Sequence, residues 1–144
     1  MRSRPKLSFL FVTLCLCACT SKQAAAPAPD AATLLQAIPG PDRAKYERVH
    51  DMRNWRNPYL IVRTDGVGLL DLADNAEIIL KPDEMLDRLA RLPASAWPYG
   101  RVVAVTENGI RGSERDSVAI RRNRGIVGGI LQGARIAIEW VPSA

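Results

Sequence analysis

The chain has 144 residues, of which 20 are Lys or Arg, 15 are Asp or Glu and one is histidine. This length is enough for one domain and too short for two ordinary ones. With 47% hydrophobic and 24% charged residues, the composition excludes a disordered or fibrous chain. The apolar runs are too short for an ordinary transmembrane helix. Because His50 is the only histidine, a site that needs two histidines is also excluded.

Residues 1–18 have the three parts of a secretory signal. A positively charged start precedes an apolar stretch over residues 7–16, and small residues then lead to Cys19. All three cysteines lie in or next to this stretch, which excludes a disulfide framework in the rest of the chain. The segment Leu16-Cys17-Ala18-Cys19 resembles the lipobox of bacterial lipoproteins, which ends in the cysteine that receives the lipid. An ordinary cleaved signal peptide and an uncleaved anchor are the alternatives.

The lipobox resemblance implies that Cys19 carries a lipid. Its thiol would hold a diacylglycerol, and the freed amino group would take a further chain such as palmitate. Two or more chains give stable anchoring, at about 0.8 kcal/mol per buried methylene. Thr20 and Ser21 follow Cys19, so no aspartate resembles an inner-membrane retention signal. We therefore expect a lipid-anchored protein of the cell envelope, in the outer membrane and facing the periplasm.

Removal of the signal changes the charge of the chain. Residues 1–18 hold three of the 20 basic residues, which leaves 17 against 15 acidic residues and a net charge of +2. The basic excess therefore belongs largely to the signal, and a nucleic-acid partner is not expected. Apart from Cys19 the remaining chain has no cysteine, so it can fold in an oxidising compartment without disulfide chemistry.

The composition divides the chain into three parts. Residues 1–18 are the lipoprotein signal peptide, and residues 19–41 are the lipidated cysteine and a flexible tether rich in alanine and proline. One helical turn over residues 33–38 is expected inside the tether. Residues 42–144 form the globular domain, which is large enough to bury a core of its own.

The elements of the domain follow from hydrophobic spacing and turn residues. Asp42 is expected to cap a helix that runs from Arg43 to about Trp55. Pro82 opens a helix that ends before Pro93, and Ser113 with Asp116 resembles a capping box that opens a further helix. The expected extended segments are residues 59–64, 67–72, 77–80, 101–106 and 135–141. Strands that alternate with amphipathic helices predict an α+β two-layer sandwich, a small mixed sheet with helices packed on one face.

From Tyr59 to Val141 the order and spacing of the elements resemble the periplasmic domain of the ExbD/TolR family. The matching segments are residues 60–66, 82–92, 102–105 and 133–141. The resemblance implies a small envelope module that dimerises, binds partners or binds the cell wall. The chain departs from the family because it has a lipobox in place of the family's N-terminal transmembrane helix with its aspartate. It therefore cannot act as a proton-coupled stator by that mechanism.

No catalytic constellation can be assembled from the sequence. His50 has no nucleophile placed beside it by a motif, and we interpret it as a surface histidine. Asp71, Asp74 and Glu77 recur every three residues but lack the spacing of a calcium loop, so no metal site is expected. Glu107 and Glu114 bracket a polar loop. A small envelope hydrolase with a site around Glu107–Ser117 is therefore the alternative to a non-enzymatic protein. No cofactor is expected.

The candidate binding patch is basic. Arg121, Arg122 and Arg124 form a cluster near Arg111 and Arg115, and the exposed loop residue Trp97 would add an aromatic contact. A solvated helix face, and for Trp97 a lid on the core, are the alternatives. Gly125, Gly129 and Gly133 form a bare stripe if this segment is helical. Close approach to the sheet or to a second copy would explain the stripe, and so would fraying of the helix after Arg124.

Together these features predict a non-enzymatic binding or scaffolding module on a lipid anchor. Its expected partner is an envelope protein or peptidoglycan, and a homodimer is a further expectation. The basic cluster is the part of the sequence that favours an acidic partner.

Overall fold

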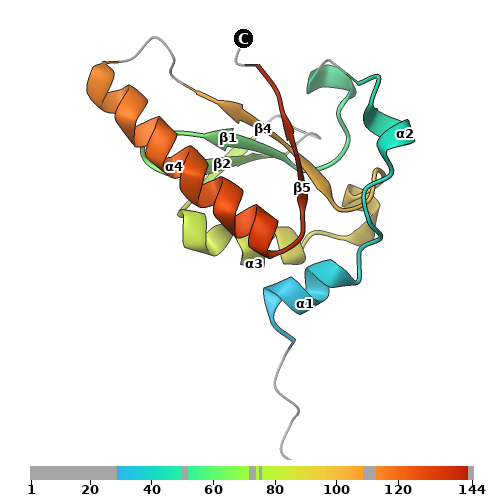
Figure 1. Ribbon diagram of the computed structural model, residues 1–144. Helices are drawn as coiled ribbons and strands as arrows, with labels where there is room; N and C mark the ends of the chain where they lie inside the picture. The colour runs from blue at the N-terminus through green and yellow to red at the C-terminus, as the bar shows by residue number, and fades with distance from the viewer. Residues whose placement is uncertain (1–28, 50–51, 72–73, 75, 109–112, 143–144) are drawn as a thin grey trace, which may run out of the picture.

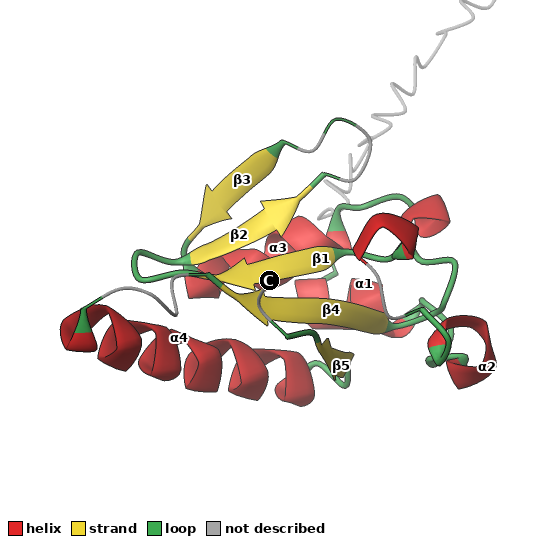
Figure 2. Cartoon of the chain, turned by 90° about the horizontal axis from the view of Figure 1, so that it is seen from above, coloured by secondary structure: helices red, strands yellow, loops and turns green. Residues whose placement is uncertain are grey.

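The computed structural model describes residues 29–49, 52–71, 74, 76–108 and 113–142. Five strands form one mixed sheet in the order β3-β2-β1-β4-β5 (Figure 2). The strands are β1 (Tyr59–Val62), β2 (Val67–Leu70), β3 (Glu77–Leu80), β4 (Val102–Glu107) and β5 (Ala137–Trp140). The helices are α1 (Ala31–Gln36), α2 (Arg43–Tyr46), α3 (Met85–Ala90) and α4 (Glu114–Gly133). Short 3-10 turns are η1 (Met52–Asn54), η2 (Pro82–Glu84) and η3 (Ala94–Ala96).

The predicted α+β fold is confirmed. β1, β2 and β3 form an antiparallel meander, whereas β4 is parallel to both β1 and β5. The long connections into β4 and β5 carry α3 and α4, as parallel neighbours require. Helices α1, α3 and α4 pack on one face of the sheet, and Figure 1 shows α4 crossing in front of the strands.

The main core lies between this sheet face and the three helices. Leu60 and Val62 of β1 are fully buried there, as the alternation of the strand predicts. Val103 and Val105 supply the same face of β4. The helices contribute Leu35, Met85, Leu89, Ile120, Val127 and Leu131.

A second, aromatic cluster covers part of the opposite face. The rings of Tyr46, Trp55 and Tyr99 lie 5.2 to 6.0 Å apart between centroids and pack against Tyr59 of β1. The short helix α2 supplies Tyr46, and the turn η1 directly precedes Trp55. The helices therefore do not all lie on one face of the sheet. α1, α3 and α4 cover the face of the main core, and α2 packs with the aromatic cluster on the other face.

The expected helix from Arg43 to about Trp55 is wrong. α2 ends at Tyr46, and η1 follows only at Met52. Tyr46 and Trp55 are nine positions apart, which on one helix of about 3.6 residues per turn would place them on opposite faces. Both side chains pack in the same aromatic cluster, at 8% and 4% exposure. Burial of the two rings together therefore breaks the helix.

The folded domain begins before residue 42. α1 is capped by Asp30, whose carboxylate accepts the backbone N–H of Thr33 at 2.7 Å. Leu35 of α1 is fully buried in the main core, a burial worth about 2 kcal/mol. Gln36 donates a hydrogen bond to the carbonyl of Ala134, just after α4. Residues 31–41 are therefore part of the domain rather than of a tether.

Candidate functional site

The basic patch lies on α4, where residues 121, 122, 124 and 115 are all exposed. Ser113 and Asp116 form the predicted capping box at the start of this helix, with Ser113 Oγ accepting the N–H of Asp116 at 3.2 Å. Arg121 and Arg122 have no ion pair within the part of the chain that the structure describes. Arg111 lies outside the described residues. The structure thus places four of the five arginines on one helix.

Arg124 differs from its neighbours because it is held in place. Its Nη1 donates to Oε1 of Glu107 at 2.6 Å, and its guanidinium carbon lies 4.2 Å from the centroid of the Trp140 ring. A guanidinium stacked on an indole and paired with a carboxylate is restrained in both position and direction. Arg124 therefore shapes the surface between α4 and β5 rather than offering an unpaired charge.

The exposed aromatic residue of this surface is Trp140, which the sequence interpretation did not single out. It lies on the edge strand β5 and is 39% exposed. Trp97, which was expected to join the patch, is 5% exposed and belongs to the main core. The interpretation of Trp97 as a lid on the core therefore holds, and Trp97 is not part of the binding surface. No sequence signal distinguished Trp140, because its exposure follows from the position of β5 at the edge of the sheet.

The glycine stripe is helical over its whole length, so fraying after Arg124 is wrong. α4 continues to Gly133. Added Cβ atoms at Gly125, Gly129 and Gly133 would meet no atom of the described residues within 4 Å beyond the nearby backbone of α4 itself. The stripe therefore does not serve close packing against the sheet. At Gly128 the nearest such contact is the Trp140 ring, at 4.0 Å.

A shallow groove runs along α4 beside β5. Gly125, Gly128 and Gly129 lie along it, and Arg121 and Gln132 lie towards its two ends. Arg124 and Trp140 also line it. We call this surface the α4 groove. Its floor is bare helix backbone, its wall is an indole, and its charge is positive.

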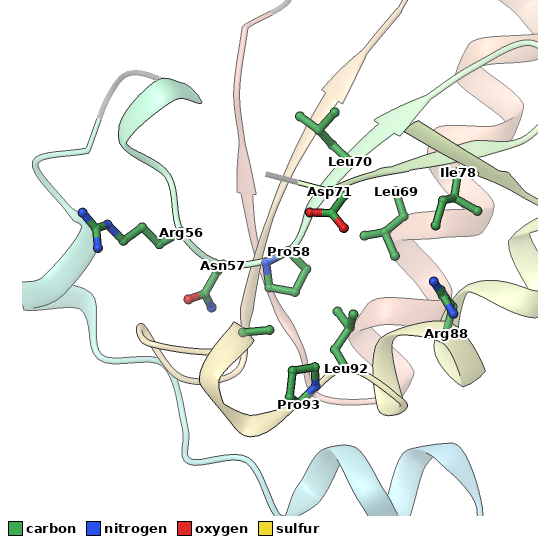
Figure 3. A pocket seen from close by; sticks show the side chains of 11 residues that line it. Arg56, Asn57, Pro58, Leu69, Leu70, Asp71, Ile78, Arg88, Leu92 and Pro93 are labelled. Carbon is green, nitrogen blue, oxygen red and sulfur yellow. The ribbon is translucent and has the colours of Figure 1, made fainter. Parts of the chain in front are cut away.

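A second hollow lies on the helix-covered side of the sheet, between the strands and α3. This open hollow has an accessible volume of about 260 Å³, and its apolar walls include Pro58, Leu69, Ile78, Leu92, Pro93 and Ala96 (Figure 3). Its charged lining residues are Arg56, Asp71 and Arg88. We call it the α3 pocket. No sequence signal pointed to it, because its walls come from four segments far apart along the chain.

Several groups of the Glu107–Ser117 segment are engaged in structural contacts, whereas Glu114 is exposed in the first turn of α4. Glu107 pairs with Arg124, and Ser113 caps α4. Ser117 Oγ donates to the carbonyl of Ser113 at 3.3 Å. Residues 109–112 and His50 lie outside the described residues. Among the residues with described positions, no group of three or more His, Cys, Asp or Glu side chains could hold a metal ion.

Among the residues that the structure describes, two ionisable groups have clearly shifted pKa values. Burial raises the pKa of the Tyr59 hydroxyl above its usual value, although a hydrogen bond with the Thr106 side chain opposes the shift. The hydrogen bonds from Thr33 lower the pKa of Asp30. Tyr59 lies in the aromatic cluster and Asp30 caps α1, so neither residue lines the α4 groove or the α3 pocket.

No protein-family model, curated protein or solved structure matches the chain. None of the helices with described positions is long and apolar enough to span a bilayer.

Proposed function

We propose that this protein is a lipid-anchored lipoprotein of the cell envelope whose domain binds a partner through the α4 groove. The domain acts without catalysis, as a binding or scaffolding module. Cys19 lies outside the described residues, so the proposal of a lipid anchor rests on the lipobox-like sequence that ends at Cys19. An outer-membrane position facing the periplasm is part of the proposal.

The exposed glycine stripe is the observation that carries the binding role. Each glycine in a helix interior costs about 1 kcal/mol relative to alanine. Alanine would fit at Gly125 and Gly129, because its Cβ would meet no described atom outside the helix's own nearby backbone within 4 Å. Packing within the domain therefore does not account for the glycines. A partner whose own backbone or ring lies directly on α4 does, because a Cβ at these positions would hold it away.

The charge around the groove defines the kind of partner. Arg121 lies at the groove and Arg122 lies next to it on α4, and both are exposed. Both guanidiniums lack an ion pair with the described residues. An acidic surface would neutralise them, and both a protein partner and the carboxylates of peptidoglycan provide one. Trp140 offers a flat apolar contact beside them.

The sequence from Tyr59 to Val141 also resembles the periplasmic domain of the ExbD/TolR family. That resemblance favours an envelope module that dimerises or binds partners or cell wall. A second copy is therefore a third candidate occupant of the α4 groove. It is the least favoured on charge, because two copies would bring Arg121 and Arg122 of each towards each other.

The anchor is tested by labelling the full chain with radioactive palmitate in a bacterial host. Wild type should incorporate label and fractionate with outer membranes, and Cys19→Ala should lose both. Cys17→Ala is the matched control, because it changes a cysteine of the signal that is not expected to accept lipid. Equal labelling of wild type and Cys19→Ala would overturn the lipid anchor.

The binding role is tested with the chain from Thr20 onwards, which contains every described element. Co-sedimentation with purified peptidoglycan and crosslinking in envelope extract measure the retained fraction, and sedimentation equilibrium measures the mass in solution. Arg121→Glu/Arg122→Glu should reduce retention at least about tenfold. Arg48→Glu/Arg91→Glu changes the net charge equally at exposed sites outside the groove and should bind as wild type. Equal loss in both pairs would show that only net charge matters and would contradict the α4 groove as the site.

A further inference from the structure

We infer that the α3 pocket is a second binding site, specific for a small apolar molecule that carries one carboxylate. It lies on a different part of the domain from the α4 groove, since the two share no lining residue. A result that overturns this inference would therefore leave the proposed function of the α4 groove untouched, and the reverse also holds.

The size of the pocket limits the ligand. The accessible volume of the pocket is about 260 Å³. This is below the about 300–1,000 Å³ of typical sites for drug-sized molecules. The pocket therefore suits a short acyl chain or a single amino-acid residue rather than a cofactor.

The walls of the pocket are apolar on two sides. Leu69 of β2 and Ile78 of β3 face it from the sheet, and Leu92 faces it from the segment after α3 (Figure 3). Ile78 remains 37% exposed, which leaves an apolar surface that nothing in the described chain covers. A hydrocarbon group inserted here would bury that surface and gain the usual hydrophobic contribution.

Arg88 supplies the charge that selects a carboxylate. It belongs to the last turn of α3, and no hydrogen bond or ion pair joins its side chain to the described part of the protein. Arg56 also lines the pocket, but Figure 3 shows its side chain directed away from Pro58 and the pocket interior. A guanidinium at the rim of an apolar pocket binds a carboxylate with two parallel hydrogen bonds.

Asp71 is compatible with this ligand. Asp71 lines the pocket and already takes part in an interaction of its own. Arg56 is directed away from the pocket interior, so Arg88 is the cation that a ligand in the pocket would meet. A ligand carboxylate would pair with the Arg88 guanidinium, whereas an apolar amine would be repelled by it.

Two sources supply this chemistry. One is the end of a free acyl chain, and the other is the C-terminal residue of a peptide. Octanoate represents the first, and N-acetyl-leucine represents the second. Octanamide and N-acetyl-leucinamide are the matched neutral probes, because they keep the apolar part and lose the charge.

The experiment is a calorimetric titration of the chain from Thr20 onwards, which contains both cores of the domain. At least one carboxylate should bind with a dissociation constant below about 1 mM, and its amide should bind about tenfold more weakly. Amide shifts in NMR spectra should concentrate around Leu69, Ile78 and Arg88. Preference for octanoate or for N-acetyl-leucine identifies the source.

Variants separate the site from nonspecific binding. Arg88→Gln should weaken the carboxylate about tenfold and should leave the amide unchanged. Arg91→Gln is the matched control, because Arg91 lies three positions after Arg88, is exposed and does not line the pocket. Arg121→Glu/Arg122→Glu should bind the carboxylate as wild type. Equal binding of acid and amide, an unaffected Arg88→Gln variant, or no binding at about 10 mM would each overturn the inference.

Discussion

Asn57 and Tyr99 join the segments that enter two neighbouring strands: Oδ1 of Asn57 accepts the backbone N–H of Tyr99 at 2.8 Å. The same side chain donates from Nδ2 to the carbonyls of Gly100 and Val102, at 2.7 Å each. Asn57 is 0% exposed, so water cannot replace these bonds. One amide therefore fixes the entry to β1 against the entry to β4.

Asn57→Ala should destabilise the domain strongly. It leaves the N–H of Tyr99 and the carbonyl of Val102 buried without this partner, and each unsatisfied group costs about 1–3 kcal/mol. The carbonyl of Gly100 keeps a hydrogen bond from the backbone N–H of Val102. We expect a loss of about 3 kcal/mol or more in the free energy of unfolding, measured with urea. Asn108→Ala, at an exposed position, should change it by less than about 0.5 kcal/mol. Similar values for the two variants would contradict the role of Asn57.

Tyr59 should make the domain sensitive to alkali. Its pKa is raised in the folded state by burial, so the folded state holds the proton at a pH where the unfolded state has lost it. Stability is then complete below the unfolded pKa of about 10 and falls as the pH rises towards the folded value. Tyr59→Phe should remove the loss of stability that comes from this hydroxyl. The measurement compares the free energy of unfolding of the wild type and of the variant as a function of pH.

The free energy of unfolding at neutral pH provides the control for the Tyr59→Phe variant. The variant loses the hydrogen bond with Thr106, which costs about 1 kcal/mol, and keeps the packing of the ring. Wild type should therefore be the more stable protein at pH 7, and its advantage should shrink above about pH 10. Parallel curves across this range would show that the hydroxyl is not protected by burial.

The sequence allowed the strands and their buried faces to be predicted, because both depend on neighbouring residues. The alternation in residues 59–62 and the turn at Asp65-Gly66 are local signals of this kind. The position of β1 between β2 and β4 is not local. The bonds of Asn57 are not local either, since they join residues more than 40 positions apart.

The predictions that were wrong also depended on contacts between residues far apart along the chain. Residues 31–36 have the composition of a tether, and only the core around Leu35 makes them part of the domain. Trp97 lies in a loop but is buried, and Trp140 lies in an apolar strand but is half exposed. β5 is an edge strand, which leaves one side of its last side chain open to solvent. Sequence spacing does not reveal which strand is at the edge.

Gly68 and Glu77 form a coupled pair on the face of the sheet opposite α3. A Cβ at Gly68 would collide with the Glu77 carboxylate, which crosses β2 to reach Arg63 at 3.1 Å. Gly68→Ala should therefore displace Glu77 and destabilise the domain by about 1 kcal/mol. In a Glu77→Ala background the same change should be neutral or stabilising, because alanine is better than glycine in a strand by about 0.5–1 kcal/mol. A double-mutant cycle with urea measures the change of sign, and additive effects would contradict the contact.

Substitution of the α4 glycines should change stability and binding in opposite directions. Gly125→Ala/Gly129→Ala adds two methyl groups in open space and should stabilise the domain by about 1–2 kcal/mol. The same methyl groups narrow the α4 groove, so retention by peptidoglycan or by the envelope partner should fall. Gly133→Ala is the matched control, because Gly133 is equally open but does not line the groove, and its binding should match wild type. A double variant that is more stable and binds as well as wild type would exclude the α4 groove as the interface, because no loss of folding could account for that result.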